Sequence, residues 1–172
     1  MKRNKVNNLK EVHDILDKML CADYIVFGKS VNLKQFGFRF KFDKGTRRFG
    51  CCNHTKRIIS LSKSICENNL DKMQHIRDVM LHEMAHGISH FLYGKRGHGD
   101  DWKSICREIG YEPSRTFDSS LIDMPKTKYT YVCSKCGNKA HRQKRVTVPS
   151  SCAKCHPNGY SSEYRLKLVI NH

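Results

Sequence analysis

The sequence predicts an α+β fold in which a small antiparallel sheet and several helices form one domain and a small cysteine-rich module follows. Apolar and polar residues alternate over short segments between residues 36 and 62, which is typical of strands. On both sides of that region, apolar residues recur every three or four positions, as in amphipathic helices. Two C-x2-C pairs, separated by fifteen residues, come after residue 130. A chain of 172 residues is long enough for one core of ordinary size and a small second module.

Residues 8–22 form the first predicted helix. Apolar side chains recur there at the spacing of one helix face, and Asn8 precedes them as a possible N-cap. The apolar positions are Leu9, Val12, Ile15, Leu16, Met19 and Leu20. We expect this helix to pack on the sheet.

Three strands are predicted after this helix. Phenylalanine occupies every second position of residues 36–42, which predicts a strand with one aromatic face. Residues 47–52 and 56–62 predict two further strands, joined by the turn-like residues 53–55. We therefore expect a small antiparallel sheet immediately before the next helix.

That next helix carries an H-E-x-x-H motif at residues 82–86. At about 100° per residue, His82, His86 and Glu83 share one arc of the helix, while apolar residues occupy the opposite arc. Two neutral imidazoles one turn apart can bind the same zinc ion at about 2.0–2.1 Å, and the adjacent carboxylate is then placed to act as a general base. The alternative is a surface helix with two incidental histidines, but the separation of the two faces favours a metal site.

A catalytic zinc site needs a third protein ligand and leaves its fourth position to water. His90 continues the helical row, but it lies about 6 Å further along the axis than His86 and approaches from the same side. His98 lies in the glycine-rich residues 94–99, a turn that ends the helix and can bring an imidazole from another direction. We favour His98 as the third ligand and interpret His90 as a polar residue at the rim of the site.

A further helix is predicted to contain Trp102 and to end before Gly110. Asp100 or Asp101 can cap it, and the alternative is that one of them orients a ligand histidine. Residues 113–127 lose the periodicity and carry prolines and serines, so we predict a linker there.

The four cysteines of the two C-x2-C pairs have the spacing of a structural zinc site. They are Cys133, Cys136, Cys152 and Cys155. Four thiolates fill a tetrahedron and leave no open position, so this zinc is expected to stabilise a fold. His141 and His156 are alternative ligands. The alternating segments 128–132, 140–148 and 164–170 are then the strands of a zinc ribbon.

The charge of the chain favours a polyanionic partner. The formal net charge is +16, and residues 126–172 hold ten lysines and arginines against one glutamate. Nucleic acid is the partner we expect, with solvation or an acidic protein substrate as the alternative. Because no base-reading motif is visible, binding of single- or double-stranded DNA is predicted to be sequence-tolerant and sensitive to salt. The candidate contacts are Arg142, Lys144, Arg145, Arg165 and Lys167, with Tyr129 and Tyr131 for base stacking.

Cysteine usage favours a reducing compartment. Nine cysteines is an odd number and four have metal spacing, so a disulfide framework is not expected, and the other five are interpreted as small buried side chains. The basic first residues are not followed by an apolar segment, and no run of eighteen apolar residues occurs. We therefore expect a monomeric protein that is cytoplasmic, or nuclear in a eukaryote, is not secreted, and does not associate with a membrane.

Taken together, these motifs resemble the SprT-like zinc metallopeptidase family, whose eukaryotic member is called Spartan. The resemblance rests on the H-E-x-x-H motif and on residues 97–102, which are similar to the family's H-G-x-x-[FW] segment. Residues 48–52 and 58–62 look like the two strands that precede its helix. The metzincin pattern fits worse, because it requires glycine at Ser89 and histidine at Leu92.

The resemblance implies a zincin-like metallopeptidase domain at residues 1–112, a linker at 113–127 and a zinc ribbon at 128–172. It also implies two zinc ions per chain: one bound by His82, His86 and His98, with Glu83 as the catalytic residue, and one bound by the four cysteines.

The activity expected is hydrolysis of peptide bonds by a water molecule that zinc and Glu83 activate. By resemblance, the substrates are proteins associated with or crosslinked to DNA. The alternative is a non-enzymatic DNA- or RNA-binding zinc protein with a vestigial protease domain.

Overall fold

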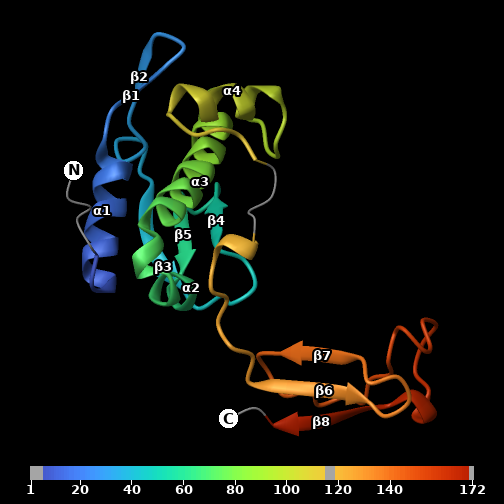
Figure 1. Ribbon diagram of the computed structural model, residues 1–172. Helices are drawn as coiled ribbons and strands as arrows, with labels where there is room; N and C mark the ends of the chain where they lie inside the picture. Colours follow the sequence, from blue (N-terminus) through green and yellow to red (C-terminus); the bar gives the residue numbers. More distant parts are fainter. Residues whose placement is uncertain (1–5, 115–118, 171–172) are drawn as a thin grey trace. The chain divides into compact units, whose positions relative to one another are not determined.

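The computed structural model describes residues 6–114 and 119–170, which form two compact units that divide between Pro125 and Lys126. The predicted mixture of helices and small sheets is confirmed (Figure 1). The helices of the first unit are α1 (Leu9–Cys21), α2 (Lys63–Asn68), α3 (Met73–Tyr93) and α4 (Asp100–Glu108). Its strands are β1 (Tyr24–Val26), β2 (Lys29–Val31), β3 (Arg39–Asp43), β4 (Gly50–Asn53) and β5 (Ile58–Ser62). None of the helices in the described ranges is long and apolar enough to cross a membrane.

Helix α1 confirms the first predicted helix. The Asn8 side chain accepts a hydrogen bond from the Glu11 N–H at 3.0 Å, and the Glu11 carboxylate accepts one from the Asn7 N–H at 3.0 Å. This reciprocal pairing satisfies backbone donors that a helix leaves unbonded in its first turn. Val12, Leu16 and Leu20 are fully buried. The cap and the apolar face therefore place α1 against the core.

The main sheet is mixed, which corrects the prediction that it is antiparallel. The strand order is β3-β5-β4, with β4 antiparallel and β3 parallel to β5. β4 and β5 form a hairpin, and the chain crosses from the end of β3 to the start of that hairpin, so β3 meets β5 in the same direction. Alternation within a strand reports which face is buried but not which strand is its neighbour. β4 is left as an edge strand.

The predicted aromatic strand begins later than expected, at Arg39. Phe38 and Phe40 are buried, as the alternation predicts, but Gly37 adopts a positive φ of 81° and separates Phe36 from the strand. A hairpin that the sequence analysis missed, β1–β2, turns at Phe27 and Gly28, both with positive φ. Such turns match the twist of short hairpins.

Helix α3 lies at the centre of the first unit and packs against α1, α4, β4 and β5 (Figure 1). Ile76, Met80, Met84 and Ile88, spaced four residues apart, are fully buried. The helix ends at Gly94, whose φ of 64° is left-handed and whose N–H donates to the His90 carbonyl at 2.8 Å. One face of α3 therefore belongs to the core, and its end is a sharp turn.

The start of α4 differs from the prediction. Gly99 is its N-cap residue, with no side-chain cap, and both aspartates lie in the first helical turn. Asp100 pairs with Lys103 at 3.0 Å, and Asp101 pairs with Lys95. Negative charge in the first turn is favourable to the helix dipole without a capping bond.

Part of the predicted linker packs on the first unit instead. Ile122 is buried in the core, and the fully buried Asn69 exchanges two hydrogen bonds with the backbone of Asp123, at 2.8 and 2.9 Å. A short 3-10 helix, Ser119–Leu121, leads into this contact. Residues 115–118 of the predicted linker lie outside the described residues. Burial by distant partners is not visible in local composition, which explains the difference.

The second unit is a three-stranded antiparallel sheet. Its strands are β6 (Tyr129–Cys133), β7 (Lys139–Arg142) and β8 (Leu166–Ile170), in the order β7-β6-β8. β7 is shorter than the predicted strand at 140–148, because the chain leaves the sheet after Arg142. Val148, at the end of the predicted strand, is exposed. The Val146 N–H instead donates to the Tyr131 hydroxyl at 2.7 Å.

Candidate metal centre

His82, His86 and His98 come together at the chemical face of α3. Their Nε2 atoms are 3.2 to 3.3 Å apart in all three pairings. Tetrahedral zinc, at about 2.0–2.1 Å from each imidazole nitrogen, requires ligand nitrogens about 3.3–3.4 Å apart. The triangle therefore fits one such ion and leaves a fourth position open. His90, the alternative third ligand, does not belong to this group among the described residues.

Local sequence explains this convergence. His82 and His86 are one helical turn apart on α3, and the left-handed Gly94 ends the helix soon after them. Gly97, with a φ of 91°, helps the chain turn back so that His98 approaches from a different direction. The loop therefore supplies the third nitrogen that a straight helix cannot supply.

Trp102 forms one wall of the site. Its ring centroid lies 4.9, 5.2 and 4.5 Å from those of His82, His86 and His98, and it is only 2% exposed. A shell of this kind limits the rotation of the imidazoles and excludes water from one side of them. In the sequence, Trp102 marks only a helix and a family motif, because its packing on all three rings depends on the fold.

Burial keeps the imidazoles of His82 and His86 neutral. The pKa of His82 is lowered to about 4, first by burial and then by the charge of His98, although a hydrogen bond to the Ser114 backbone partly opposes the shift. The pKa of His86 is lowered to about 3, chiefly by burial and then by the neighbouring histidines. Neutral imidazole is the form that binds metal ions. At neutral pH the nitrogens of His82 and His86 are therefore ready to coordinate without first losing a proton.

The Glu83 side chain lies against Gly50, at the start of strand β4. It is 8% exposed, and burial raises the pKa of its carboxyl to about 7, although a hydrogen bond from the Cys52 backbone and the charge of Arg48 act in the opposite direction. A carboxyl with a pKa near neutral pH is suited to accepting and returning a proton. A cavity of about 310 Å³ adjoins Glu83 and His82, with Arg47, Arg48 and Tyr111 among its walls.

Two residues at this cavity could not be predicted from the sequence. The Tyr111 ring is 6.0 Å from that of His82, and its hydroxyl adds a polar group near Glu83. Gly50 lies directly against Glu83: a Cβ atom at this position would be 2.8 Å from the Cγ and Oε1 atoms of Glu83. Neither residue has a spacing relation to the H-E-x-x-H motif, so only the fold reveals them.

The Gly50→Ala substitution is therefore expected to displace the Glu83 carboxylate. A misplacement of about 1 Å at a catalytic group can cost roughly 100-fold in rate. For the peptide hydrolysis that the sequence predicts, we expect kcat/KM to fall by about 10- to 100-fold while the metal content stays unchanged, as measured by kinetics and elemental analysis. Gly99→Ala is the matched control, because a Cβ atom there meets nothing within 4 Å and its φ is negative. Unchanged activity in Gly50→Ala would show that Glu83 tolerates the shift.

The four cysteines of the second unit also come together. Their Sγ atoms lie within 4.8 Å of one another, and those of Cys136 and Cys152 are 3.7 Å apart. Tetrahedral zinc with four thiolates at about 2.3 Å requires sulfur atoms about 3.8 Å apart. The alternative ligands lie elsewhere: His141 Nδ1 is 3.1 Å from the Thr130 hydroxyl, and the His156 ring stacks on Tyr164. The cluster therefore fits one ion with no open position.

The basic residues predicted to contact nucleic acid are all exposed, but they do not share one face of the sheet. Lys167 is paired with Val132 in the β6–β8 register, whereas Arg142 is paired with Tyr129 in the β6–β7 register. Positions 129 and 132 point to opposite faces, because side chains alternate along a strand. Tyr131 is buried and accepts the Val146 N–H, so it is not available for base stacking.

Comparison with known proteins identifies the family to which the first unit is similar. Residues 17–122 match the SprT-like family. The chain is 36% identical over 91 residues to a protein named SprT-like from Lactococcus lactis subsp. lactis (strain IL1403), which covers 49% of this chain and 58% of the relative. It is 34% identical over 77 residues to protein SprT of Vibrio atlanticus (strain LGP32), covering 44% of this chain and 45% of the relative.

The family match covers only part of this chain and of its relatives. The chain spans about half the length of these curated relatives, and no solved structure matches it. The family match ends at Ile122, so it leaves out the zinc ribbon at residues 128–172 that the resemblance implies, with its four-cysteine cluster. It does include the three clustered histidines and Glu83. The chain therefore belongs to the SprT-like family.

Proposed function

We propose that this protein is a zinc-dependent metallopeptidase that hydrolyses peptide bonds. The observation that carries the proposal is the triangle of imidazole nitrogens, 3.2 to 3.3 Å on each side, next to a buried carboxyl group in a cavity. His82, His86 and His98 would hold the ion. When bound, zinc supplies Lewis-acid chemistry, because it lowers the pKa of water and polarises a carbonyl group.

Glu83 is the residue that moves the proton. Its carboxylate would accept a proton from the attacking water and deliver it to the amide nitrogen of the leaving group. The Cys52 backbone N–H and the close fit of Gly50 hold the carboxylate in place. A purely structural metal site has no need for a carboxyl group held in this way, which favours the enzyme over the vestigial-domain alternative.

Strand β4 offers a place for the substrate backbone. It has β5 on one side only, and it lies beside the part of α3 that carries Glu83. An extended peptide can add to such an edge by main-chain hydrogen bonds. We propose that the substrate binds there as an extended segment, so that loosely folded proteins are cleaved in preference to compact ones.

We further propose that the second unit brings the protease to nucleic acid. Its exposed arginines and lysines can neutralise phosphates without reading bases. The substrates would then be proteins bound or crosslinked to DNA. The direct experiment is cleavage of a loosely folded protein with and without single- and double-stranded DNA. DNA binding by a wild-type chain that shows no Glu83-dependent cleavage under any condition would favour the non-enzymatic alternative.

Replacing Arg142, Lys144 and Arg145 with Gln is expected to weaken DNA binding about tenfold or more. Each lost phosphate contact also makes the dependence of log K on log salt shallower by roughly 0.7–0.9. Fluorescence anisotropy with short oligonucleotides over a series of salt concentrations measures both effects. The control removes three charges from exposed residues of the first unit, Lys10, Lys18 and Arg77. Equal losses in the two triple variants would mean that binding follows net charge and has no site in the second unit.

A further inference from the structure

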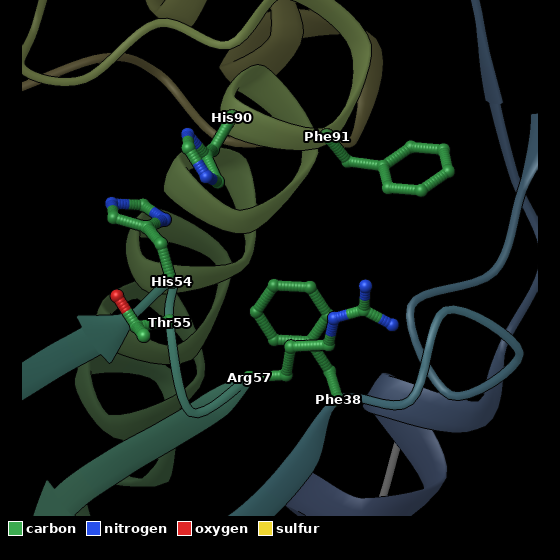
Figure 2. Close-up of a pocket in the computed structure, with 6 residues that line it drawn as sticks. All are labelled: Phe38, His54, Thr55, Arg57, His90 and Phe91. Carbon is green, nitrogen blue, oxygen red and sulfur yellow. The ribbon is translucent and has the colours of Figure 1, made fainter.

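A second cavity, of about 360 Å³, is lined in part by residues near the end of α3 (Figure 2). Its lining residues are Phe38, His54, Thr55, Arg57, His90 and Phe91. His90 follows His86 by one turn of α3, which is about 6 Å along the helix axis. His54 is near enough to His86 to contribute to lowering the pKa of His86. The cavity therefore adjoins the metal centre on the side opposite Val79 and Glu83 along α3.

The lining of this cavity favours an anionic group. Three of the six lining residues are basic in type and none is acidic. Arg57 donates to the Phe36 carbonyl at 2.7 Å, which fixes its guanidinium, and it forms no ion pair with a carboxylate of the described residues. The charge of Arg96 also reaches the cavity, because it helps burial and His90 to lower the pKa of His54.

His90 contributes a polar atom with no hydrogen-bond partner. Its Nδ1 is buried, and no group in the part of the chain that the structure describes bonds to it. Such an atom is costly to leave unsatisfied. Figure 2 shows the rings of His54 and His90 facing each other on one side of the cavity, with Phe91 on the other side. Polar groups and an apolar wall together suit a carboxylate on a short aliphatic stem.

Strand β4 connects this cavity to Glu83. Gly50, at the start of the strand, contacts Glu83, and His54 immediately follows its last residue, Asn53. A peptide extended along this edge advances about 3.3 Å per residue and directs alternate side chains to one side. Two residues therefore span about 7 Å, close to the helical turn that separates His86 from His90.

We infer that this cavity is a substrate subsite for an acidic side chain, Asp or Glu. The acidic residue lies two positions from the scissile bond in the substrate. It is in the half of the bound peptide that runs along β4 toward Asn53 and His54. The inference rests on the proposed peptidase function and specifies a substrate class for it.

A set of quenched fluorescent peptides tests this subsite with the 172-residue chain loaded with zinc. The peptides share one sequence except that a single position, moved along the peptide, carries Glu, Gln or Lys. At one position, two residues from the cleaved bond, we expect kcat/KM to be about tenfold higher for Glu than for Gln, and lower still for Lys. Arg57→Gln is expected to reduce the ratio of kcat/KM for the Glu peptide to that for the Gln peptide to about twofold or less.

Two further variants keep the test decisive. Arg57 also holds the Phe36 carbonyl, so His90→Gln serves as a second variant that leaves this bond intact and is expected to lower the same ratio. Arg77→Gln removes one charge from an exposed position of α3 outside the cavity and is expected to keep the wild-type ratio.

The subsite is overturned if no position shows a preference for Glu, if the preference survives both cavity variants, or if Arg77→Gln loses the preference to the same extent. Loss of DNA affinity in Arg57→Gln without a change in peptide preference would also overturn it, and would assign the cavity to a phosphate. If no peptide is cleaved in a Glu83-dependent way, the peptidase proposal itself fails, and the subsite fails with it.

Discussion

Replacing Glu83 with Gln is expected to reduce peptide hydrolysis by roughly 100- to 10,000-fold, the usual contribution of a general base. Gln has almost the same shape as Glu, so the contact with Gly50 and the hydrogen bond from the Cys52 backbone can persist. It cannot accept a proton at neutral pH, so the water is no longer activated. The measurement is kcat/KM on a loosely folded protein or peptide, with zinc content determined on the same sample.

The pH dependence of stability provides a control for folding. Burial raises the pKa of Glu83 in the folded, metal-free chain from 4.5 to about 7. A carboxyl group with a raised pKa stabilises the folded state less as pH rises from its unfolded pKa through its folded pKa. Without metal, Glu83→Gln is therefore expected to unfold at no lower a temperature than wild type above pH 7. An inactive variant that unfolds much earlier would mean that activity is lost through misfolding, and an active one would exclude Glu83 as the base.

Removing the metal from the four-cysteine cluster is expected to unfold the second unit. Among the described residues of that unit, the buried apolar side chains are only Tyr131, Cys133 and Cys152. So small a core gives a domain little stability unless a metal ion or a disulfide adds to it. A structural zinc site contributes about 10–16 kcal/mol of binding free energy. The variant is Cys152→Ser, which removes a fully buried thiol from the cluster. Amide NMR spectra and limited proteolysis of the full chain should show loss of order in residues 126–170.

The first unit should remain folded in the same sample, because its core does not depend on those cysteines. Cys21→Ser, which changes an exposed cysteine outside the cluster, is expected to leave both units intact. A Cys152→Ser chain whose second unit stays folded and resists protease would show that the sheet β7-β6-β8 is stable without metal.

Local features of this protein follow from its sequence more reliably than distant contacts do. The Asn8 cap and the helix it begins depend on residues within one turn, and the spacing of His82 and His86 follows directly from helix geometry. The approach of His98 was expected on similar grounds, because glycines mark the turn that ends α3. In each case the physical cause lies within a few residues.

Contacts between distant residues were beyond such reasoning. The parallel pairing of β3 with β5 depends on how the chain crosses over, and the burial of Asn69 depends on Asp123, 54 residues away. Gly50, Tyr111 and Arg57 acquire their surroundings only when β4, α3 and the residues after α4 come together. Sequence patterns identify which groups are suited to the chemistry, whereas the shape of the cavities depends on the whole unit.

The packing of Trp102 on the three histidines also gives this protein an optical property. Trp102 is the only tryptophan in the chain, so all tryptophan fluorescence comes from this one side chain. Its ring centroid lies within 5.2 Å of the centroids of all three imidazole rings. No second indole elsewhere in the chain adds to the signal. Emission from this single ring therefore reports directly on the environment of the histidine cluster, without any label.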